Sequence, residues 1–284
     1  MKHFNRVLFL TLAFLMVLCQ LSLQAGQKGK DKEKWLTLQK KDLSMGTYHT
    51  SHYKIFKKYT SGYNLEVLKG IDKVQAHAMD GGGYFIGVKA TPAESPVYYE
   101  LKLFNKSLIT PPRQSSYCSG SSYSAFVEAL NLILSKKAKR LSAERLEALR
   151  MQEPDGKRRE DWVKFWGIWN ADGFGSEFAL EQYSSMGVAV KPEDARPGDF
   201  VNISWKSGVG HSVVFLGWYI DENNNKNMVY WSSQKSSNGY GDQVVSLSKI
   251  KEVKFVRLTK PENLFNFDIN AKINKDVPGD VISW

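Results

Sequence analysis

The sequence predicts a mixed α+β protein, because helical patterns fill its middle and short strand-like runs fill its last third. Apolar residues recur at helical spacing between Ser121 and Ser135. Beyond Arg196-Pro197-Gly198 the pattern changes to short β-type runs separated by polar turns. Helices followed by an antiparallel meander are typical of an α+β domain. With 42% hydrophobic and 24% charged residues, the 284-residue chain has the composition of a packed globular protein, which excludes a disordered chain.

The first 25 residues have the pattern of a secretory signal peptide. Lys2 and Arg6 come before an apolar run from Val7 to Leu18, and Ala25 provides a small residue for cleavage. The apolar run is too short to span a bilayer comfortably. We therefore expect an exported protein, periplasmic or extracellular, that is cleaved near Ala25 and has no stable membrane insertion.

Two other interpretations of this segment remain open. A lipoprotein would be anchored through Cys19, although Leu18 stands where a small residue is expected, and an uncleaved anchor is the third possibility. Cleavage near Ala25 removes Cys19 and leaves Cys118 as the one thiol, so an internal disulfide is excluded. It also lowers the formal net charge of +10 by two, and the remaining positive charge favours acidic partners.

Before Pro111 the best signals are two strand-like runs, at 84–89 and 97–103. A proline-containing link joins them, so a hairpin is the simplest arrangement. Residues 26–34 are charged and free of apolar side chains, as expected of a flexible leader.

The rest of the chain divides into helices and then strands. Besides the helix that starts near Ser121, helical patterns occur at 142–151, 159–170 and 176–186. Strands are expected at 199–205, 212–220, 228–232, 244–247 and 253–258. The polar segment 221–227 joins the second and third strands into a hairpin.

Cys118 is the candidate nucleophile. It comes immediately before the predicted helix, whose unpaired N–H groups and positive dipole end favour a thiolate. Ser119 and Gly120 are small, so a substrate carbonyl can approach and a backbone N–H can bind the oxyanion.

His211 is the candidate base. Of the mature chain's histidines, only this one follows a glycine-rich entrance, Gly208-Val209-Gly210, into an apolar strand. A turn centred near Asn224 would place Gln234 across from Val214 and Ser232 across from Leu216. Gln234 is thus the first candidate to orient the imidazole, and Ser232 the second.

These residues resemble the NlpC-type cell-wall peptidases, relatives of the CHAP amidases. The resemblance rests on three motifs in order: Tyr117-Cys118-Ser119-Gly120, Arg196-Pro197-Gly198-Asp199-Phe200 and Gly210 to Gly217. It covers roughly 112–258 and implies a papain-like fold, with the catalytic Cys at a helix N-terminus packed on an antiparallel sheet. It also implies hydrolysis of amide bonds in peptidoglycan stem peptides or cross-links, without a metal or organic cofactor.

The sequence departs from the family at three places. Tyr117 stands where the family usually has Asp, no His, Asn or Glu stands clearly at the third catalytic position, and the segment 131–186 is longer than a minimal member needs. Trp162, Trp166 and Trp169 in that segment form a stripe that is most simply buried. These departures bear on which bond is cut more than on the type of reaction.

Substrate contacts are predicted around the nucleophile. The candidate residues are Tyr117, Ser119, Arg113 and Arg196, the arginines because stem peptides are acidic. Gln114 is a further candidate for the oxyanion, although a solvated loop residue is the simpler interpretation.

The resulting organisation is an exported enzyme with an N-terminal extension. The predicted segments are a signal peptide (1–25), an N-terminal accessory region (26–110), an NlpC-like catalytic domain (111–260) and a C-terminal tail (261–284). A non-catalytic cell-wall binding protein and an acyltransferase on the same scaffold remain alternatives.

Two other ligand classes receive no support from the sequence. Basic residues are scattered rather than striped, so nucleic-acid binding is unsupported. His49 and His52 have a spacing that suits two metal ligands, but no cluster of carboxylates or cysteines accompanies them in the sequence, so no metal site is predicted.

Overall fold

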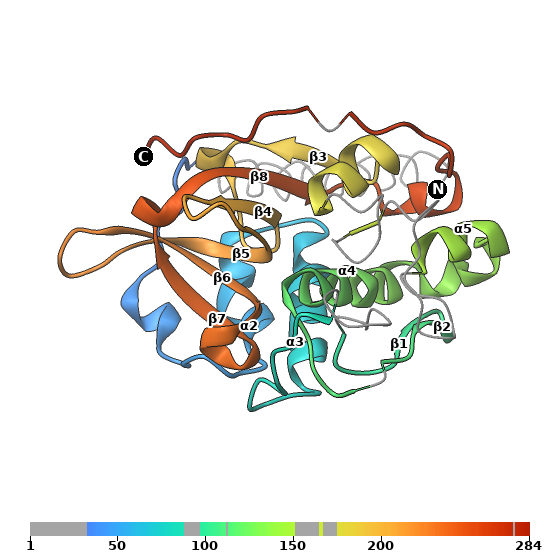
Figure 1. The fold of residues 1–284 in the computed structure, drawn as a ribbon, viewed down its shortest axis with the longest axis horizontal. Coiled ribbons are helices and arrows are strands. Elements are labelled where there is room, and N and C mark those ends of the chain that lie inside the picture. The colour runs from blue at the N-terminus through green and yellow to red at the C-terminus, as the bar shows by residue number, and fades with distance from the viewer. Residues whose placement is uncertain (1–32, 88–96, 112, 151–164, 167–174, 275) are drawn as a thin grey trace, which may run out of the picture. The chain divides into compact units, whose positions relative to one another are not determined.

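The computed structural model describes residues 33–87, 97–111, 113–150, 165–166, 175–274 and 276–284. The chain divides into two units, Met1–Lys34 and Trp35–Trp284, and every described helix and strand lies in the second. That unit combines helices with antiparallel sheets (Figure 1), which confirms the α+β prediction at this level. No helix within the described residues is long and apolar enough to cross a lipid bilayer.

The elements follow one another as helices, a small hairpin, more helices and then a sheet. The α-helices are α2 (His52–Phe56), α3 (Asn64–Gln75), α4 (Cys118–Leu134) and α5 (Ala143–Leu149). Short 3-10 helices are Lys40–Leu43, Lys57–Tyr59, Ser135–Arg140, Pro192–Asp194, Lys235–Ser237, Leu247–Lys249 and Pro261–Phe265, and a π-helix is Phe178–Tyr183. The strands are β1 (Leu101–Leu103), β2 (Lys106–Ile109), β3 (Gly187–Val190), β4 (Phe200–Trp205), β5 (Gly210–Ile220), β6 (Lys226–Gln234), β7 (Gly239–Ser246) and β8 (Ile250–Leu258). The main sheet has the order β3-β8-β4-β5-β6-β7, with each neighbouring pair antiparallel.

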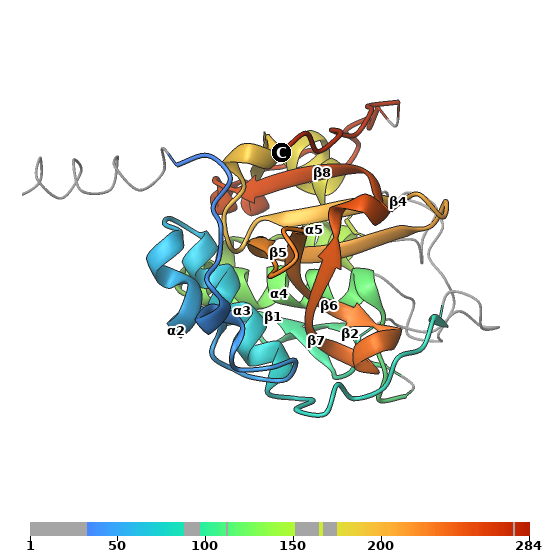
Figure 2. The ribbon, with the colours of Figure 1, turned by 90° about the vertical axis from the view of Figure 1, so that its left-hand side faces the viewer.

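Helix α4 lies at the centre of the unit, packed on β5, β6 and α3 (Figure 1). Most of its residues are buried, as expected of a helix that is covered on several sides. The contact with α3 is close, because a Cβ at Gly70 would come within 2.6 Å of the Ala125 carbonyl oxygen. Figure 2 shows α2 and α3 side by side. The region before residue 110 therefore shares its core with the strands, and the predicted boundary near 110 does not separate two compact units.

The predicted helices and strands of the second half are largely confirmed. The structure extends several of them, and the helix predicted from Ser121 begins three residues earlier, at Cys118. The helix predicted at 176–186 is shorter and contains the π-helix Phe178–Tyr183. Strand β3 begins directly after the predicted helix, at Gly187, and is a four-residue edge strand that the sequence pattern did not reveal. Of the helix predicted at 159–170, only Phe165 and Trp166 are among the described residues, and both are buried.

The predicted N-terminal hairpin is wrong. The hairpin that the structure contains instead pairs β1 with β2. Its two turn residues, Phe104 and Asn105, both have positive φ (50° and 63°). Such a two-residue turn fits the twist of adjoining strands. Tyr84 forms only an isolated bridge with Ser116, and much of the predicted link lies outside the described residues.

The predicted register of the β5–β6 hairpin is also wrong. Val214 pairs with Trp231 rather than with Gln234. The turn is centred one residue earlier than expected, since Ile220 pairs with Lys226, and a register shift between Phe215 and Gly217 adds one more residue. A bulge of this kind leaves one residue unpaired and moves every later partner along the strand. Continuing the observed pairing along both strands brings Gln234 opposite His211.

Candidate active site

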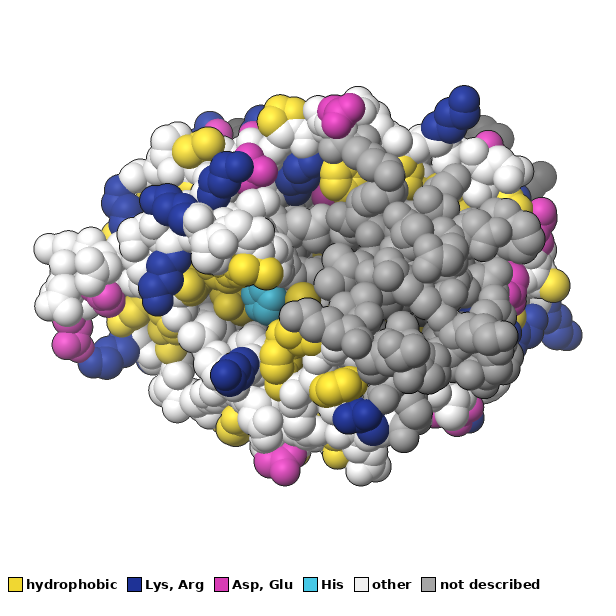
Figure 3. Space-filling view, viewed as in Figure 1, with side chains coloured by type: hydrophobic (Ala, Val, Ile, Leu, Met, Phe, Trp, Pro, Cys, Tyr) yellow, Lys and Arg dark blue, Asp and Glu magenta, His cyan; other side chains and the backbone are white. Residues whose placement is uncertain are grey.

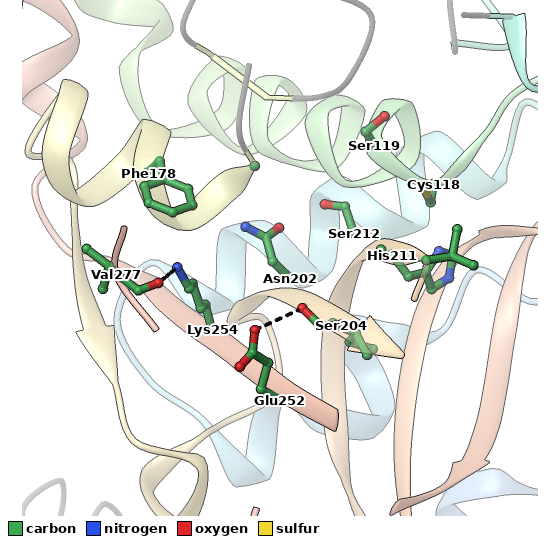
Figure 4. A pocket seen from close by; sticks show the side chains of 14 residues that line it. Cys118, Ser119, Phe178, Asn202, Ser204, His211, Ser212, Glu252, Lys254 and Val277 are labelled. Carbon is green, nitrogen blue, oxygen red and sulfur yellow. Dashed lines mark hydrogen bonds between the residues drawn. The ribbon is translucent and has the colours of Figure 1, made fainter. Parts of the chain in front are cut away.

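Cys118 and His211 line the same pocket, whose volume is about 420 Å³. It lies between the start of α4 and one face of β4, β5 and β8 (Figure 4). Its other lining residues are Ser119, Gly175, Phe178, Asn202, Ile203, Ser204, Val209, Gly210, Ser212, Glu252, Lys254 and Val277. On the face drawn in Figure 3, a histidine side chain is visible among hydrophobic side chains.

Cys118 is the first residue of α4 and is half-buried. Tyr117 before it is extended (φ −145°, ψ 175°), so the chain enters the helix directly at the thiol. Burial raises the pKa of the Cys118 thiol, and the backbone amides of Ser212, Ser119 and Cys118 itself act in the opposite direction without cancelling it. Desolvation therefore outweighs these hydrogen bonds, and the resting group is the thiol rather than the thiolate.

His211 lies on β5, opposite Ile203 of β4. Its ring sits between Trp205 and Tyr230, with ring centroids 6.0 and 5.5 Å away. Burial among these rings lowers its pKa to about 4, and the side chain of Gln234 opposes this only in part. The imidazole is thus neutral near pH 7, and within the described part of the chain its Nε2 has no hydrogen-bond partner, so it is available to accept a proton.

Gln234 is the better of the two predicted third groups. Its amide nitrogen donates to Ser237 Oγ and, at 3.1 Å, to the Gly241 carbonyl oxygen. Its Oε1 is buried and has no partner among the described residues, which leaves an acceptor for a protonated His211. Ser232 differs, because its Oγ donates to the Ser212 carbonyl oxygen at 2.8 Å and lies 3.1 Å from Ser121 Oγ. Ser232 therefore joins the helix to the sheet.

Serine hydroxyls fix the start of α4 on the strands. Ser121 Oγ accepts from the backbone N–H of Ser233 at 3.0 Å and donates to the Cys118 carbonyl at 2.6 Å. Ser122 Oγ lies 2.7 Å from Ser212 Oγ and accepts a hydrogen bond from the Trp166 indole at 2.6 Å. Small side chains let the helix approach the sheet closely and satisfy buried polar groups. These serine hydrogen bonds hold Cys118 beside β5, and no motif in the sequence indicated them.

Of the four predicted substrate contacts, one lines the pocket. Ser119 is buried there, and its Oγ has no partner among the described residues. Tyr117 is buried in the core, so its ring supports the helix start. Arg196 is also buried, and its guanidinium donates to the Ala195 carbonyl at 2.8 Å. Arg113 is exposed and lies over the Phe85 ring at 4.0 Å, and neither it nor the exposed Gln114 lines the described pocket.

The other side of the pocket is lined by polar residues that none of the sequence motifs indicated. Asn202 and Ser204 alternate along β4, and Glu252 and Lys254 alternate along β8. Polar residues two apart on central strands place their side chains on one face, and that periodicity was the available signal.

His49 and His52 do have carboxylate partners, contrary to the expectation that none accompany them. Nε2 of His49 and Nε2 of His52 lie 3.0 and 2.8 Å from the two oxygens of Asp242, and Nδ1 of His52 lies 2.8 Å from Asp72. The Ser51 backbone N–H donates to His49 Nδ1, which puts the proton of a neutral His49 on Nε2, facing Asp242. These contacts form a buried ion-pair network that joins α2, α3 and β7. Asp72 and Asp242 are 170 positions apart in the sequence, so no local motif predicts that they contact the two histidines.

Comparisons with protein-family models, with curated proteins and with solved structures find no match to this chain.

Proposed function

We propose that this chain is an exported cysteine hydrolase of papain-like fold that cleaves amide bonds in peptidoglycan stem peptides or cross-links. The observation that carries the proposal is the pocket shared by a thiol at the first residue of a long helix and a neutral imidazole on the adjoining sheet. The fold brings these two residues, 93 positions apart in the sequence, into the lining of one pocket, as nucleophilic catalysis by Cys and His requires.

The first step follows from the two pKa shifts. Since Cys118 rests as a thiol and His211 as a neutral imidazole, attack on the amide carbonyl requires His211 to take the thiol proton as the S–C bond forms. The imidazolium then protonates the leaving amine as the C–N bond breaks, which leaves an acyl-thioester on Cys118. Water, deprotonated by His211, hydrolyses the thioester and restores the thiol.

Backbone N–H groups at the start of α4 supply the oxyanion site. The first N–H groups of a helix have no partner within the helix, and those of Cys118 and Ser119 are next to the attacking sulfur. The Ser119 hydroxyl, buried in the pocket, is a further donor. Gln234 acts on the imidazolium, because its Oε1 can accept an N–H from the charged ring and so stabilise it during the reaction.

The choice of substrate rests on the motifs and on charge. The motifs around Cys118, Arg196 and His211 resemble those of cell-wall peptidases, and the positive net charge that remains after cleavage near Ala25 favours acidic stem peptides. The N-terminal signal pattern supports export to the compartment where such peptides occur.

A non-catalytic cell-wall binding protein is the second candidate. The raised thiol pKa and the lowered imidazole pKa favour it, because together they make a reactive ion pair costly at rest. An acyltransferase would use the same first steps and pass the acyl group to an amine.

Mass spectrometry of peptidoglycan fragments incubated with the purified protein tests the proposal. We expect new stem-peptide products, no products from Cys118→Ala or His211→Gln, and normal products from Ser248→Ala, an exposed serine that does not line the pocket. Products joined to an added amine would indicate transfer. Absence of products from fragments of every length, with all proteins folded, would contradict the hydrolase and favour the binding protein.

A further inference from the structure

The end of the pocket opposite the nucleophile holds two opposite charges that do not pair with each other. Lys254 and Glu252 both line the pocket, on the side away from Cys118 and His211 (Figure 4). They stand two residues apart on β8 and so share a face of the strand. Both are partly buried.

Each of these charged side chains has a hydrogen bond with an uncharged oxygen of the protein. Lys254 Nζ donates to the Val277 carbonyl and lies 4.2 Å from the centre of the Phe178 ring. Glu252 Oε1 accepts from Ser204 Oγ at 3.4 Å. No salt bridge in the described part of the chain joins Lys254 to Glu252. An ammonium has three donors and a carboxylate two oxygens, so both retain hydrogen-bonding capacity toward the pocket.

Glu177 is a further acidic neighbour of Lys254. Burial and the nearby Glu181 raise the pKa of Glu177 to about 7 although Lys254 acts in the opposite direction, so the Glu177 carboxyl is only partly ionised at neutral pH. The charge of Lys254 is thus left incompletely balanced by the protein.

Asn202 lies between this end and the nucleophile. Its Oδ1 accepts from the backbone N–H and the hydroxyl of Ser176, both at 3.3 Å. Its Nδ2 is buried and has no partner among the described residues. In Figure 4 the Asn202 side chain points into the pocket between the two ends, and its Nδ2 lies beside Gly175, which also lines the pocket.

We propose that Lys254 and Glu252 bind a zwitterionic α-amino-acid group of the substrate, an ammonium and a carboxylate on one carbon, while Asn202 donates to a carbonyl between that group and the scissile bond. This inference rests on the proposed function and names the chemistry that its pocket selects. Same-face positions on a strand are about 7 Å apart, which accommodates such a group with a hydrogen bond of about 3 Å at each end. A substrate whose amine is acylated or whose carboxylate is amidated leaves one of these partly buried charges without its partner.

The test compares three synthetic peptidoglycan-type peptides with the full protein. The first has a side chain that ends in a free α-amino-acid group, the second has that amine acetylated, and the third has that carboxylate amidated. We expect kcat/KM to fall roughly tenfold or more for each blocked peptide. Lys254→Met should lose the discrimination against the amidated peptide, and Glu252→Gln the discrimination against the acetylated one. Lys251→Met, an exposed lysine on the same strand, serves as the matched control and should keep both.

Two results separate this inference from the proposed function. Equal hydrolysis of all three peptides by the wild-type protein, or unchanged discrimination in both pocket variants, would overturn the inference and leave the hydrolase intact. If no peptide is hydrolysed, the proposed hydrolase activity is refuted. Calorimetric titration of the same peptides then tests the binding of the α-amino-acid group separately. Tighter binding of the free peptide that is lost in Lys254→Met supports it, and equal or absent binding refutes it.

Discussion

The Gln234 side chain on β6 raises the pKa of His211 on β5, against a larger lowering by burial. The two residues meet because the turn and the bulge shift the hairpin pairing from the position that alternation alone would give. Gln234 thus acts on the base from a neighbouring strand. Its amide nitrogen donates to Ser237 and Gly241, which fixes the orientation of the side chain and leaves the buried Oε1 free to accept a hydrogen bond.

Gln234→Ala should lower kcat/KM for peptide hydrolysis about tenfold or more, because the imidazolium loses the acceptor that stabilises it. Gln234→Glu should move the acid limb of the pH–rate profile to higher pH, since a carboxylate raises the pKa of His211 further. Ser232→Ala, which alters a neighbouring polar residue that binds the Ser212 carbonyl, should leave that limb in place. An acid limb that does not move in Gln234→Glu would remove Gln234 from the mechanism.

Cys118 should react with iodoacetamide at a rate that still rises between about pH 7 and about pH 8.5, because its thiol pKa is raised by burial. A thiolate formed at the helix terminus would instead show a plateau by neutral pH. Rates are measured by mass spectrometry, with circular dichroism at each pH to confirm the fold. A plateau below pH 7 would show that the helix terminus outweighs desolvation.

The protein should lose stability as the pH rises through about 9, where His52 loses its proton. Asp242 and Asp72 raise the pKa of this fully buried ring from 6.5 to about 9 in spite of burial. A group whose pKa is higher in the folded state contributes stability that is complete below about 6.5 and disappears above about 9. The shift corresponds to roughly 3 kcal/mol. Urea denaturation at a series of pH values measures it, and a midpoint independent of pH between 6 and about 9.5 would contradict the charged network.

Gly70→Ala should destabilise the protein by about 1–3 kcal/mol, because its Cβ would meet the Ala125 carbonyl oxygen at 2.6 Å. Gly210→Ala is the matched control, since its Cβ has no atom nearer than 3.9 Å. Chemical denaturation of both variants gives the difference. Equal stability of the two would mean that α3 and α4 are not packed as tightly as the structure has them.

The local spacing of apolar residues was sufficient to predict most helices and strands in the second half of the chain. Alternating and clustered apolar residues predicted β4 to β8, because a strand buried on a face imposes a period that neighbouring residues reveal. The edge strand β3 has four residues and too little periodicity to stand out. The β1–β2 hairpin depends on positive φ at Phe104 and Asn105, and Phe gives no sign of that conformation.

The sequence by itself determined the α+β class and brought out Cys118 and His211, because a small-residue helix start and a glycine-flanked strand start are local features. Only the tertiary structure decided what surrounds them. The net pKa of a thiol depends on how deeply the helix start is buried, the partner of His211 depends on a bulge, and the charges of Glu252 and Lys254 matter because β8 lies beside β4. The desolvation of a group depends on every segment that packs around it, and strand order depends on pairing between distant segments. A short stretch of sequence therefore determines neither of them.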